Sequence, residues 1–514
     1  MNSILIAAYA AASLGLFIYG MNCYVLLALY LRTHRSALRQ SADVIAGAES
    51  RFADEANLPW VTTQIPIYNE INVAERAMRT AAAMDYPRDR HEIQVLDDST
   101  DETCKIVDRV AAKLRAEGHL VNVLRRADRV GYKAGALGAG MRVAKGEFIA
   151  IFDADFVPPA HFLRHTLPFF MRDERMGLVQ ARWGHLNRED SLLTWAQAVG
   201  IDGHFMVEQS ARTFNGLLMN FNGTAGVWRR KAIEDAGGWS ADTLTEDLDL
   251  SYRAQLKGWH THFLASLEVC GELPANIADF KSQQFRWAKG SFQTAIKLLP
   301  RIWRSPCPFW VKIQATLHLT HYGIHPLMLT VALLAFPTMV CFPAKLPFVL
   351  LMGVATALVA AMLAPLSMYF VSQWKLYSRL AWRIQWVPAL MCVGVGLAVS
   401  NSRAIFEAIL GVKSAFVRTP KRGDRLRRRY RVPTTILPWI EVTLGAYCAA
   451  SVVVYFLSGK VLIGPFLIVY AAGFLGVGLA GLREARASAV AAARMKRLLR
   501  AKEKAAFLGR SQQA

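Results

Sequence analysis

Residues 147–158 read EFIAIFDADFVP, an apolar run that ends in two aspartates two positions apart. The run Glu147–Phe152 is dominated by aromatic and β-branched residues and is typical of a buried strand. It would end at Asp153-Ala154-Asp155. In open α/β sheets, ligands bind beyond the carboxyl ends of the strands. The stretch therefore predicts an α/β fold with a polar site at the end of this strand.

Two further strands are predicted to end in polar clusters. Val61–Pro66 runs into Ile67-Tyr68-Asn69-Glu70, and Glu92–Leu96 runs into Asp97-Asp98. Short apolar runs alternate with helical patterns over residues 58–290, as in an α/β domain. Since parallel strands bring their carboxyl ends to one edge of a sheet, the three clusters are expected to share one location.

The strand-end residues suit a nucleoside diphosphate and a divalent cation. Asp153 and Asp155 offer the oxygen ligands that Mg²⁺ or Mn²⁺ prefers, although they could also cap the turn before Pro158. Lys133 offers a cation to a phosphate, or is an exposed loop lysine. Asp97 and Asp98 could contact a nucleotide or form a helix N-cap cluster.

Two later motifs suit the transfer of a sugar to a hydroxyl group. Within Thr245-Glu246-Asp247, the carboxylate of Asp247 could accept the proton of the attacking hydroxyl, or the stretch could be an ordinary solvated helix start. Gln283, Arg286 and Trp287 are spaced to lie on one side of a helix. Arg286 could bind a diphosphate bidentately, and the Trp287 indole could stack on a sugar ring or lie in a membrane interface.

Long apolar runs flank this block and predict a membrane protein. The fraction of apolar residues is 53%, and the runs cover 3–31, 312–340, 346–371, 384–400, 434–457 and 460–482. Basic residues collect after the first run, at 375–383, at 418–431 and in the tail. By the positive-inside rule these basic segments and the block between them are cytoplasmic, and the N-terminus is outside. Parity then requires one of the runs not to cross, and the shortest, 384–400, is expected to be re-entrant or interfacial.

The net charge of +21 does not indicate nucleic-acid binding, because the basic clusters flank membrane runs where anionic lipid explains them. Seven cysteines without paired spacing argue against a disulfide framework or a zinc ribbon. His318, His321 and His325 recur at helical spacing within one apolar run. They could bind a metal, but a face toward the bundle interior or a polar channel is the favoured interpretation.

At this point the residues resemble the inverting glycosyltransferases of family 2, and in particular the membrane-embedded processive ones related to cellulose synthase. The series Asp, Asp-x-Asp, Thr-Glu-Asp and Gln-x-x-Arg-Trp is the signature of that group. The strongest resemblance is to the plant cellulose-synthase-like A and C proteins, which make mannan, glucomannan and glucan backbones, and to their bacterial relatives. It is carried by QIPIYNE (64–70), QVLDDSTD (94–101), IFDADFVP (151–158), FNGTAGVWRR (221–230) and ELPANIADFKSQQFRW (272–287).

The resemblance implies a nucleotide-sugar-binding, Rossmann-like GT-A domain joined to a helical transmembrane bundle. The implied organisation is an N-terminal transmembrane helix (1–31), a cytoplasmic linker (32–57), the GT-A domain (58–290), an interfacial helix (291–311), a transmembrane region (312–482) and a basic cytoplasmic tail (483–514). Within the transmembrane region it places a re-entrant or interfacial segment at 384–411 and a gating-like loop at 412–432.

The resemblance also assigns roles to residues. Tyr68, Glu70, Asp97, Asp98, Lys133, Asp153 and Asp155 would bind the donor, with Asp153 and Asp155 also holding Mg²⁺ or Mn²⁺. Asp247 would be the catalytic base, with Glu246 beside it. Asn222, Gly223, Thr224, Gln283, Arg286 and Trp287 would bind the acceptor. Phe416, Arg418, Thr419 and Lys421, in FVRTPK (416–421), would form a gating loop that closes over the donor.

The sequence departs from the family pattern at two of these positions. Arg418 stands where the gating loop of cellulose synthase carries valine, and Phe285 stands where the plant proteins carry histidine. Phe285 occupies a variable position of Gln-x-x-Arg-Trp, so the departure bears on donor or linkage preference rather than on catalysis.

The expected function is therefore processive transfer of a hexose from UDP-glucose or GDP-mannose to the non-reducing end of a β-glycan, with translocation of the polymer. The expected location is a bacterial inner membrane, and the expected partners are the donor, the growing polysaccharide and the bilayer. One alternative is a non-processive enzyme that glycosylates a membrane lipid, and another is an inactive scaffold or basic membrane-surface protein. The sequence fixes neither the donor sugar nor the oligomeric state.

Overall fold

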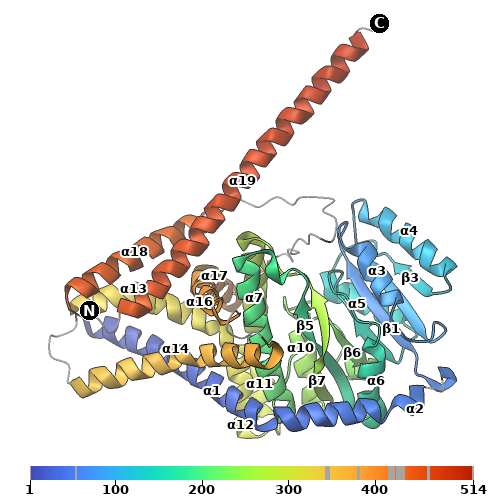
Figure 1. Ribbon diagram of the computed structural model, residues 1–514, viewed down its shortest axis with the longest axis horizontal. Coiled ribbons are helices and arrows are strands. Elements are labelled where there is room, and N and C mark those ends of the chain that lie inside the picture. The colour runs from blue at the N-terminus through green and yellow to red at the C-terminus, as the bar shows by residue number, and fades with distance from the viewer. Residues whose placement is uncertain are drawn as a thin grey trace.

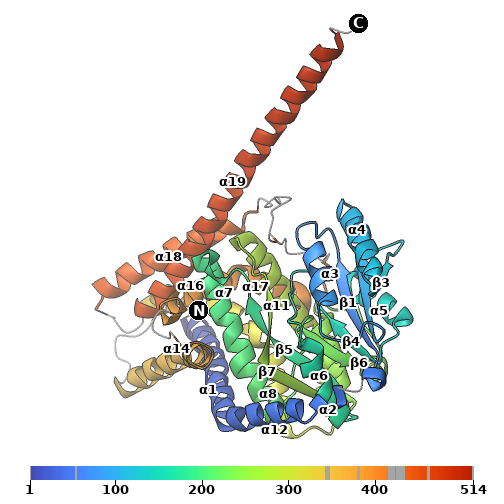
Figure 2. The ribbon, with the colours of Figure 1, turned by 45° about the vertical axis from the view of Figure 1, so that its right-hand side comes forward.

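The computed structural model of the 514-residue chain describes residues 2–52, 55–341, 348–378, 383–414, 423, 435–459 and 464–511. Figure 1 shows two parts, a domain built around a twisted sheet and a group of long helices beside it. Strands β5 and β7 lie on the side of the sheet nearer the long helices, and β3 lies at the far edge, as Figures 1 and 2 both show.

Seven strands form one mixed sheet in the order β3-β2-β1-β4-β6-β5-β7. Their bounds are Val61–Ile67 (β1), His91–Asp97 (β2), Leu120–Leu124 (β3), Phe148–Ile151 (β4), Met176–His185 (β5), Gly226–Arg229 (β6) and His260–Gly271 (β7). Strands β1 to β4 are parallel, β6 runs antiparallel to β4 and β5, and β7 is parallel to β5. The carboxyl ends of β1, β2, β4, β5 and β7 therefore meet the amino end of β6 at one edge.

Helices cover both faces of this sheet. One apolar cluster includes residues of α3 (Ala74–Ala82), α4 (Thr103–Ala116) and α6 (Phe162–Arg172). A second includes residues of α5 (Tyr132–Val143), α9 (Arg230–Asp235) and α10 (Glu246–Leu256). Since both faces are covered, every residue of β2 and β4 is buried, including the polar Glu92 and Gln94 of β2. The expected α/β fold with a helical membrane part is confirmed.

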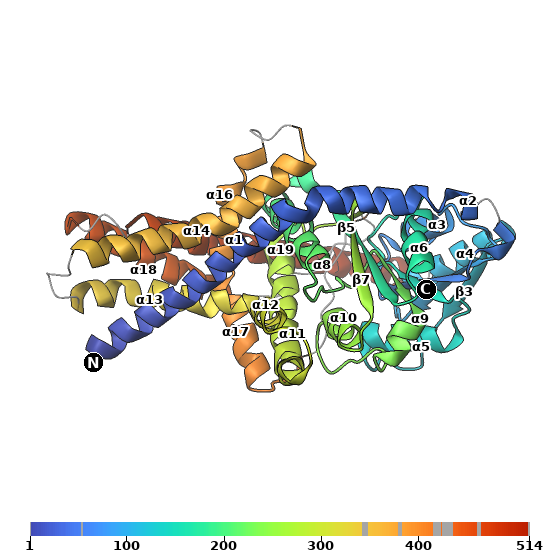
Figure 3. The ribbon, with the colours of Figure 1, turned by 90° about the horizontal axis from the view of Figure 1, so that it is seen from below.

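Four described helices are long and apolar enough to cross a membrane, at Ile4–Ala46, His321–Val340, Leu437–Leu457 and Phe466–Val490. They belong to α1 (Asn2–Ala46), η4 (His321–Gly323) with α13 (Ile324–Cys341), α18 (Leu437–Leu457) and α19 (Gly464–Ser511). A fifth span is added if α16 (Val387–Gly396) and α17 (Ala398–Ile409), which meet at 46°, count as one. That bend fits either a broken span or the re-entrant segment expected at 384–411, which stays a prediction. A further long helix, α14 (Phe348–Leu376), packs along α1 (Figure 3).

Helix α1 continues far beyond the expected first span and includes most of the segment expected as a linker. Its 45 residues correspond to about 68 Å of helix, roughly twice the thickness of a bilayer core. Figure 3 shows it passing from the long helices to the sheet domain. There Ser41 Oγ lies 3.1 Å from His262 Nε2 on β7.

The expectation of one continuous helix over 312–340 is wrong. The chain forms α12 (Phe309–Leu319), the short helix η4 and then α13. Pro326 lies in the first turn of α13, where its missing N–H leaves no bond unmade, whereas in a continuous helix its ring would crowd the Tyr322 carbonyl. The three histidines of this run therefore fall on three different elements. Among the described residues, no group of three or more His, Cys, Asp or Glu side chains could hold a metal ion.

Helix α11 (Ile277–Arg304) joins the sheet domain to the long helices. It runs unbroken through residue 290, where the sheet domain was expected to end. Glu484 of α19 accepts hydrogen bonds from the Ile277 and Ala278 N–H groups at 2.7 and 3.1 Å. Lys281 forms an ion pair with Glu441 of α18, and Lys289 forms one with Glu407 of α17. The N-terminal half of α11 is thus held by three helices of the membrane part.

The basic tail expected at 483–514 belongs to the same helix as the last span. Helix α19 runs from Gly464 to Ser511 and extends away from the rest of the molecule (Figure 1).

Candidate active site

A single pocket lies at the sheet edge where the strand ends meet. Among the described residues, its lining includes most of the predicted site residues, namely Tyr68, Glu70, Asp98, Lys133, Asp153, Asp155, Asn222, Gly223, Glu246, Asp247, Gln283, Arg286 and Trp287. Asp97 and Thr224 are not in the lining. Both are buried behind it, Asp97 with 1% and Thr224 with 0% of its surface exposed.

The Asp-x-Asp motif follows β4 and presents its two carboxylates differently. Asp153 points into the pocket, where its Oδ1 lies 2.6 Å from Lys133 Nζ. Asp155 is buried, and its Oδ2 accepts a hydrogen bond from the Glu272 N–H at 3.2 Å. Lys133 lies in the first turn of α5, not in an open loop, and also donates to the Gly223 carbonyl at 2.8 Å.

Three carboxylates influence Lys133. Burial alone would lower the pKa of its ammonium group, but Asp153, Glu246 and Asp247 outweigh burial and raise that pKa. Lys133 is therefore a permanent cation at neutral pH, as a phosphate contact requires. The oxygen donors of Asp153 and Asp155 fit a hard divalent cation completed by phosphate oxygens, with Asp153 the more accessible of the two.

The Thr-Glu-Asp motif begins α10, with Glu246 and Asp247 in the first turn. Burial and the neighbouring Glu246 carboxylate raise the pKa of Asp247 to about 7, against the opposing effects of Lys133, the Leu248 N–H and Arg286. Gly223, which has a φ of +80°, lies next to Asp247. A Cβ atom at Gly223 would lie 2.7 Å from Asp247 Oδ2, so the close approach requires glycine.

The ends of β1 and β2 form the wall opposite α10. Arg126 binds both carboxylate oxygens of Asp98, and Arg125 binds Asp97. The guanidinium of Arg129 lies 3.3 Å from the centroid of the Tyr68 ring. Sequence reasoning missed Arg126 and Arg129, although both lie close to Lys133 in the chain, because nothing in a single sequence pairs them with residues about 30 or 60 positions away.

The Gln-x-x-Arg-Trp motif lies in the second and third turns of α11, further into the helix than expected. Gln283, Arg286 and Trp287 face the pocket together, which their spacing predicted. Trp183 at the end of β5 also lines the pocket, and its ring centroid lies 6.5 Å from that of Trp287. Trp183 was missed as a site residue, though an aromatic residue at a strand end in a sugar-binding sheet was a usable signal.

The gating-like residues Phe416, Arg418, Thr419 and Lys421 lie outside the described residues. Two described neighbours of that segment contact the domain: Ser414 Oγ lies 2.5 Å from Lys289 Nζ, and the Gly423 N–H donates to the Glu272 carboxylate at 3.1 Å. Glu272 lines the pocket.

Comparisons with known proteins agree with this architecture. The model of the family "Glycosyltransferase like family 2" matches residues 59–290. A probable glucomannan 4-beta-mannosyltransferase of Arabidopsis thaliana is 34% identical over 456 residues, which cover 82% of this chain and 78% of the relative. A glucomannan 4-beta-mannosyltransferase from the same plant is 42% identical over 263 residues, 50% of this chain and 49% of the relative. Among solved structures, a mannosyltransferase of Pyrobaculum calidifontis in complex with GDP-Man and Mn²⁺ is 19% identical, with a TM-score of 0.46, covering 76% of this chain and 100% of that one.

Sheet, pocket and family match together define a class, the hexosyltransferases built on a GT-A-like sheet. The chain belongs to glycosyltransferase family 2, in the cellulose-synthase-like group that includes the glucomannan 4-beta-mannosyltransferases. Its apolar helices make it a membrane protein of that group.

Proposed function

We propose that the protein is a processive β-glycosyltransferase that extends a mannan- or glucan-type chain from a nucleotide-sugar and moves the product across the membrane. The observation that carries the proposal is that Asp247, Lys133, Asp153 and Trp287 line one pocket, in which Lys133 interacts with both carboxylates. The pocket thus combines a base, a cationic phosphate site and an aromatic floor for sugar.

In this proposal the donor binds along the ends of β1, β2 and β4. Tyr68, Glu70 and Asp98 contact the nucleoside, with Asp97 supporting them from behind. Lys133 and Arg286 bind the diphosphate. Asp153 and Asp155 would hold Mg²⁺ or Mn²⁺, which would neutralise charge on the diphosphate. Phe416, Arg418, Thr419 and Lys421 would close over the bound donor.

The transfer itself is a single displacement. The Asp247 carboxylate takes the proton of the acceptor hydroxyl, whose oxygen attacks the anomeric carbon of the donor sugar. The bond between that carbon and the diphosphate oxygen breaks, and the nucleoside diphosphate leaves with the electron pair. Because attack and departure occur on opposite faces, the anomeric configuration inverts. Asn222, Gly223 and Gln283 hold the acceptor end, which stacks on Trp287, and Thr224 supports them from behind.

The names of the relatives favour GDP-mannose as the donor and UDP-glucose as the second candidate. A polymer product is supported by the family and by a pocket that borders α11, which is anchored to three long helices. These relatives are plant proteins and give no support to a bacterial inner membrane. We therefore propose only a multi-pass membrane protein whose sheet domain faces the cytoplasm.

The test is incubation of the purified, detergent-solubilised chain with labelled GDP-mannose or UDP-glucose and Mg²⁺ or Mn²⁺. We expect a polymer that a β-1,4-mannanase or β-1,4-glucanase degrades. A product that stays small and lipid-extractable would favour glycolipid synthesis instead. An Asp247→Asn variant should lose about 10²- to 10⁴-fold of the transfer rate. If the wild type releases no nucleotide from either donor, the enzyme proposal fails.

A further inference from the structure

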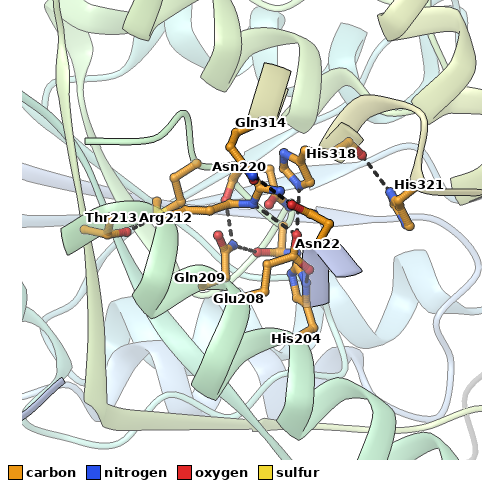
Figure 4. A network of polar contacts seen from close by, with 12 residues as sticks. Asn22, His204, Glu208, Gln209, Arg212, Thr213, Asn220, Gln314, His318 and His321 are labelled. Atoms are coloured by element: carbon orange, nitrogen blue, oxygen red, sulfur yellow. Dashed lines mark hydrogen bonds and ion pairs between the residues drawn. The ribbon is translucent and has the colours of Figure 1, made fainter. Parts of the chain in front are cut away.

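A buried polar network lies below the acceptor side of the pocket. It is centred on one turn of π-helix, η3 (His204–Gln209), which joins α7 (Leu192–Gly203) to α8 (Ser210–Phe214). Such turns are rare and often occur at functional sites. Figure 4 shows His204, Glu208, Gln209 and Arg212 of this segment converging with His318 of α12.

The hydrogen bonds that link Gln209, Asn222, His204 and Glu208 can be given donors and acceptors by starting from the Asn220 carbonyl, which can only accept. Gln209 Nε2 donates to the Asn220 carbonyl at 2.9 Å, so its amide orientation is fixed, and its second hydrogen goes to Asn222 Oδ1 at 2.7 Å. The Nδ2 group of Asn222 therefore faces His204 Nε2, at 3.2 Å, and must donate to it. His204 then carries its hydrogen on Nδ1 and donates it to Glu208 Oε2 at 2.9 Å.

Both polar atoms of the Asn222 side chain, Oδ1 and Nδ2, therefore form hydrogen bonds within the network. The backbone N–H of Asn222 is held as well, by Gln180 Oε1 at 3.2 Å. The next two residues contact other groups of the site. The Gly223 carbonyl accepts a hydrogen bond from Lys133, and Gly223 borders Asp247, while Thr224 Oγ1 accepts a hydrogen bond from the Asp153 N–H at 2.9 Å. The position of Asn222 therefore fixes the wall that faces the base.

Glu208 is itself firmly held as an anion. Burial would raise the pKa of its carboxyl group, but Arg212, His204 and His318 outweigh burial and keep that pKa well below its usual range. Arg212 Nε donates to its Oε1 at 3.0 Å, and His318 Nε2 lies 3.9 Å from the same oxygen. His318 also bonds to Tyr252 of α10 at 2.6 Å. Glu208 keeps 21% of its side chain exposed. A largely desolvated carboxylate with this many partners is costly to assemble, and a contribution to stability alone is a weak reason to keep it.

We propose that His204 and Glu208 are positioning residues for the acceptor. Glu208 holds His204 in one tautomer, and His204 holds Asn222, so that the segment 222–224 presents the acceptor hydroxyl to Asp247. The inference rests on the proposed function, since it concerns the acceptor half of that same site. Neither side chain is part of the pocket lining, so both act on the site through Asn222.

The test uses the full-length chain with a soluble β-1,4-manno-oligosaccharide as acceptor and the donor that the wild type prefers. His204→Phe keeps a ring but removes both hydrogen bonds, and we expect acceptor KM to rise, or kcat to fall, at least about tenfold. Donor KM and nucleotide affinity should stay within about twofold, because the donor wall is untouched. His204→Gln places an oxygen near the former Nε2 position and should recover a large part of the loss.

Gln314 provides a matched control. Gln314 of α12 donates to Asn22 Oδ1 at 2.7 Å, a part-buried bond that joins α12 to α1 (Figure 4). Gln314→Met should lower thermal stability as His204→Phe does, yet leave acceptor KM unchanged. The inference is overturned if His204→Phe transfers like the wild type, or if donor and acceptor parameters deteriorate equally in His204→Phe and His204→Gln. A wild type that transfers from neither donor overturns the proposed function, and the inference with it.

Discussion

At the scale of single residues, the role proposed for Asp247, that of the base, is the most demanding in the pocket. A base must be ionised to take a proton, and burial together with Glu246 places its pKa at about 7. Below that pH the carboxyl group is protonated, so we expect kcat/KM to fall up to about tenfold per pH unit under acid conditions and to level off above neutrality. Initial rates of nucleotide release across the neutral range measure this profile.

The Glu246→Gln variant provides the comparison for this profile. Because the Glu246 carboxylate raises the pKa of Asp247, removing its charge should move the midpoint to lower pH. A midpoint that stays in place in the variant would show that another group governs the profile.

Gly223 offers a second test at this scale. Alanine at Gly223 would place a Cβ atom 2.7 Å from Asp247 Oδ2, in a backbone conformation with φ +80°. We expect Gly223→Ala to reduce transfer at least about a hundredfold, since it displaces the base. Gly216 has φ +67° with nothing within 4 Å of its Cβ position, so Gly216→Ala carries the same backbone cost of about 1–2 kcal/mol without the clash. Equal losses of activity in the two variants would contradict the argument.

The site residues that could be predicted are those whose residue type and spacing are typical of a particular chemical role. Asp98, Asp153 and Trp287 belong to short motifs at strand ends or on one helix face, and the fold brings them into one pocket. Arg129 and His204 could not be predicted in this way. Each acts through a partner that is distant in the chain, Tyr68 for Arg129 and Asn222 for His204, and only the sheet topology brings them together.

At the scale of elements, the first turn of α11 has an unusual partner. The helix N-terminus leaves N–H groups without intrahelical partners, and Glu484 of α19 accepts two of them. We expect Glu484→Ala to destabilise the folded protein by about 1–2 kcal/mol and to weaken acceptor binding, because α11 carries Trp287. Thermal unfolding in detergent micelles and acceptor KM report the two effects.

Glu484→Gln is the graded variant for this contact, since it keeps one oxygen acceptor without the charge. Its melting temperature should lie between those of the wild type and Glu484→Ala. A Glu484→Ala protein that melts like the wild type would show that water satisfies these N–H groups instead.

Regular elements were predictable where one local rule dominates. The strand expected at Val61–Pro66 is observed as Val61–Ile67, a run in which β-branched residues predominate. The break before α13 was missed because hydropathy alone does not register the effect of Pro326 on the preceding turn. The π-helical turn at His204–Gln209 was missed because it depends on tertiary contacts and not on local helix propensity.

At the scale of the whole molecule, the basic clusters and the apolar helices predict an orientation. The sheet domain and the tail should share one side of the membrane, with the N-terminus on the other. We expect a protease added outside sealed vesicles of native orientation to remove a tag fused before residue 2, and to leave a tag fused after residue 514. Cleavage of both tags, or of neither, would contradict an odd number of crossings.

The course of α11 also limits how such an enzyme could be recombined with other proteins. A gene fragment that ends at residue 290, where the family match ends, would cut this helix just past Lys289. It would encode the donor wall intact, but it would lose Glu484, Glu441 and Glu407, the partners that hold the acceptor floor. The unit that must be kept together is therefore larger than the sheet domain. A fusion protein intended to synthesise polymer must include the membrane helices that contact α11.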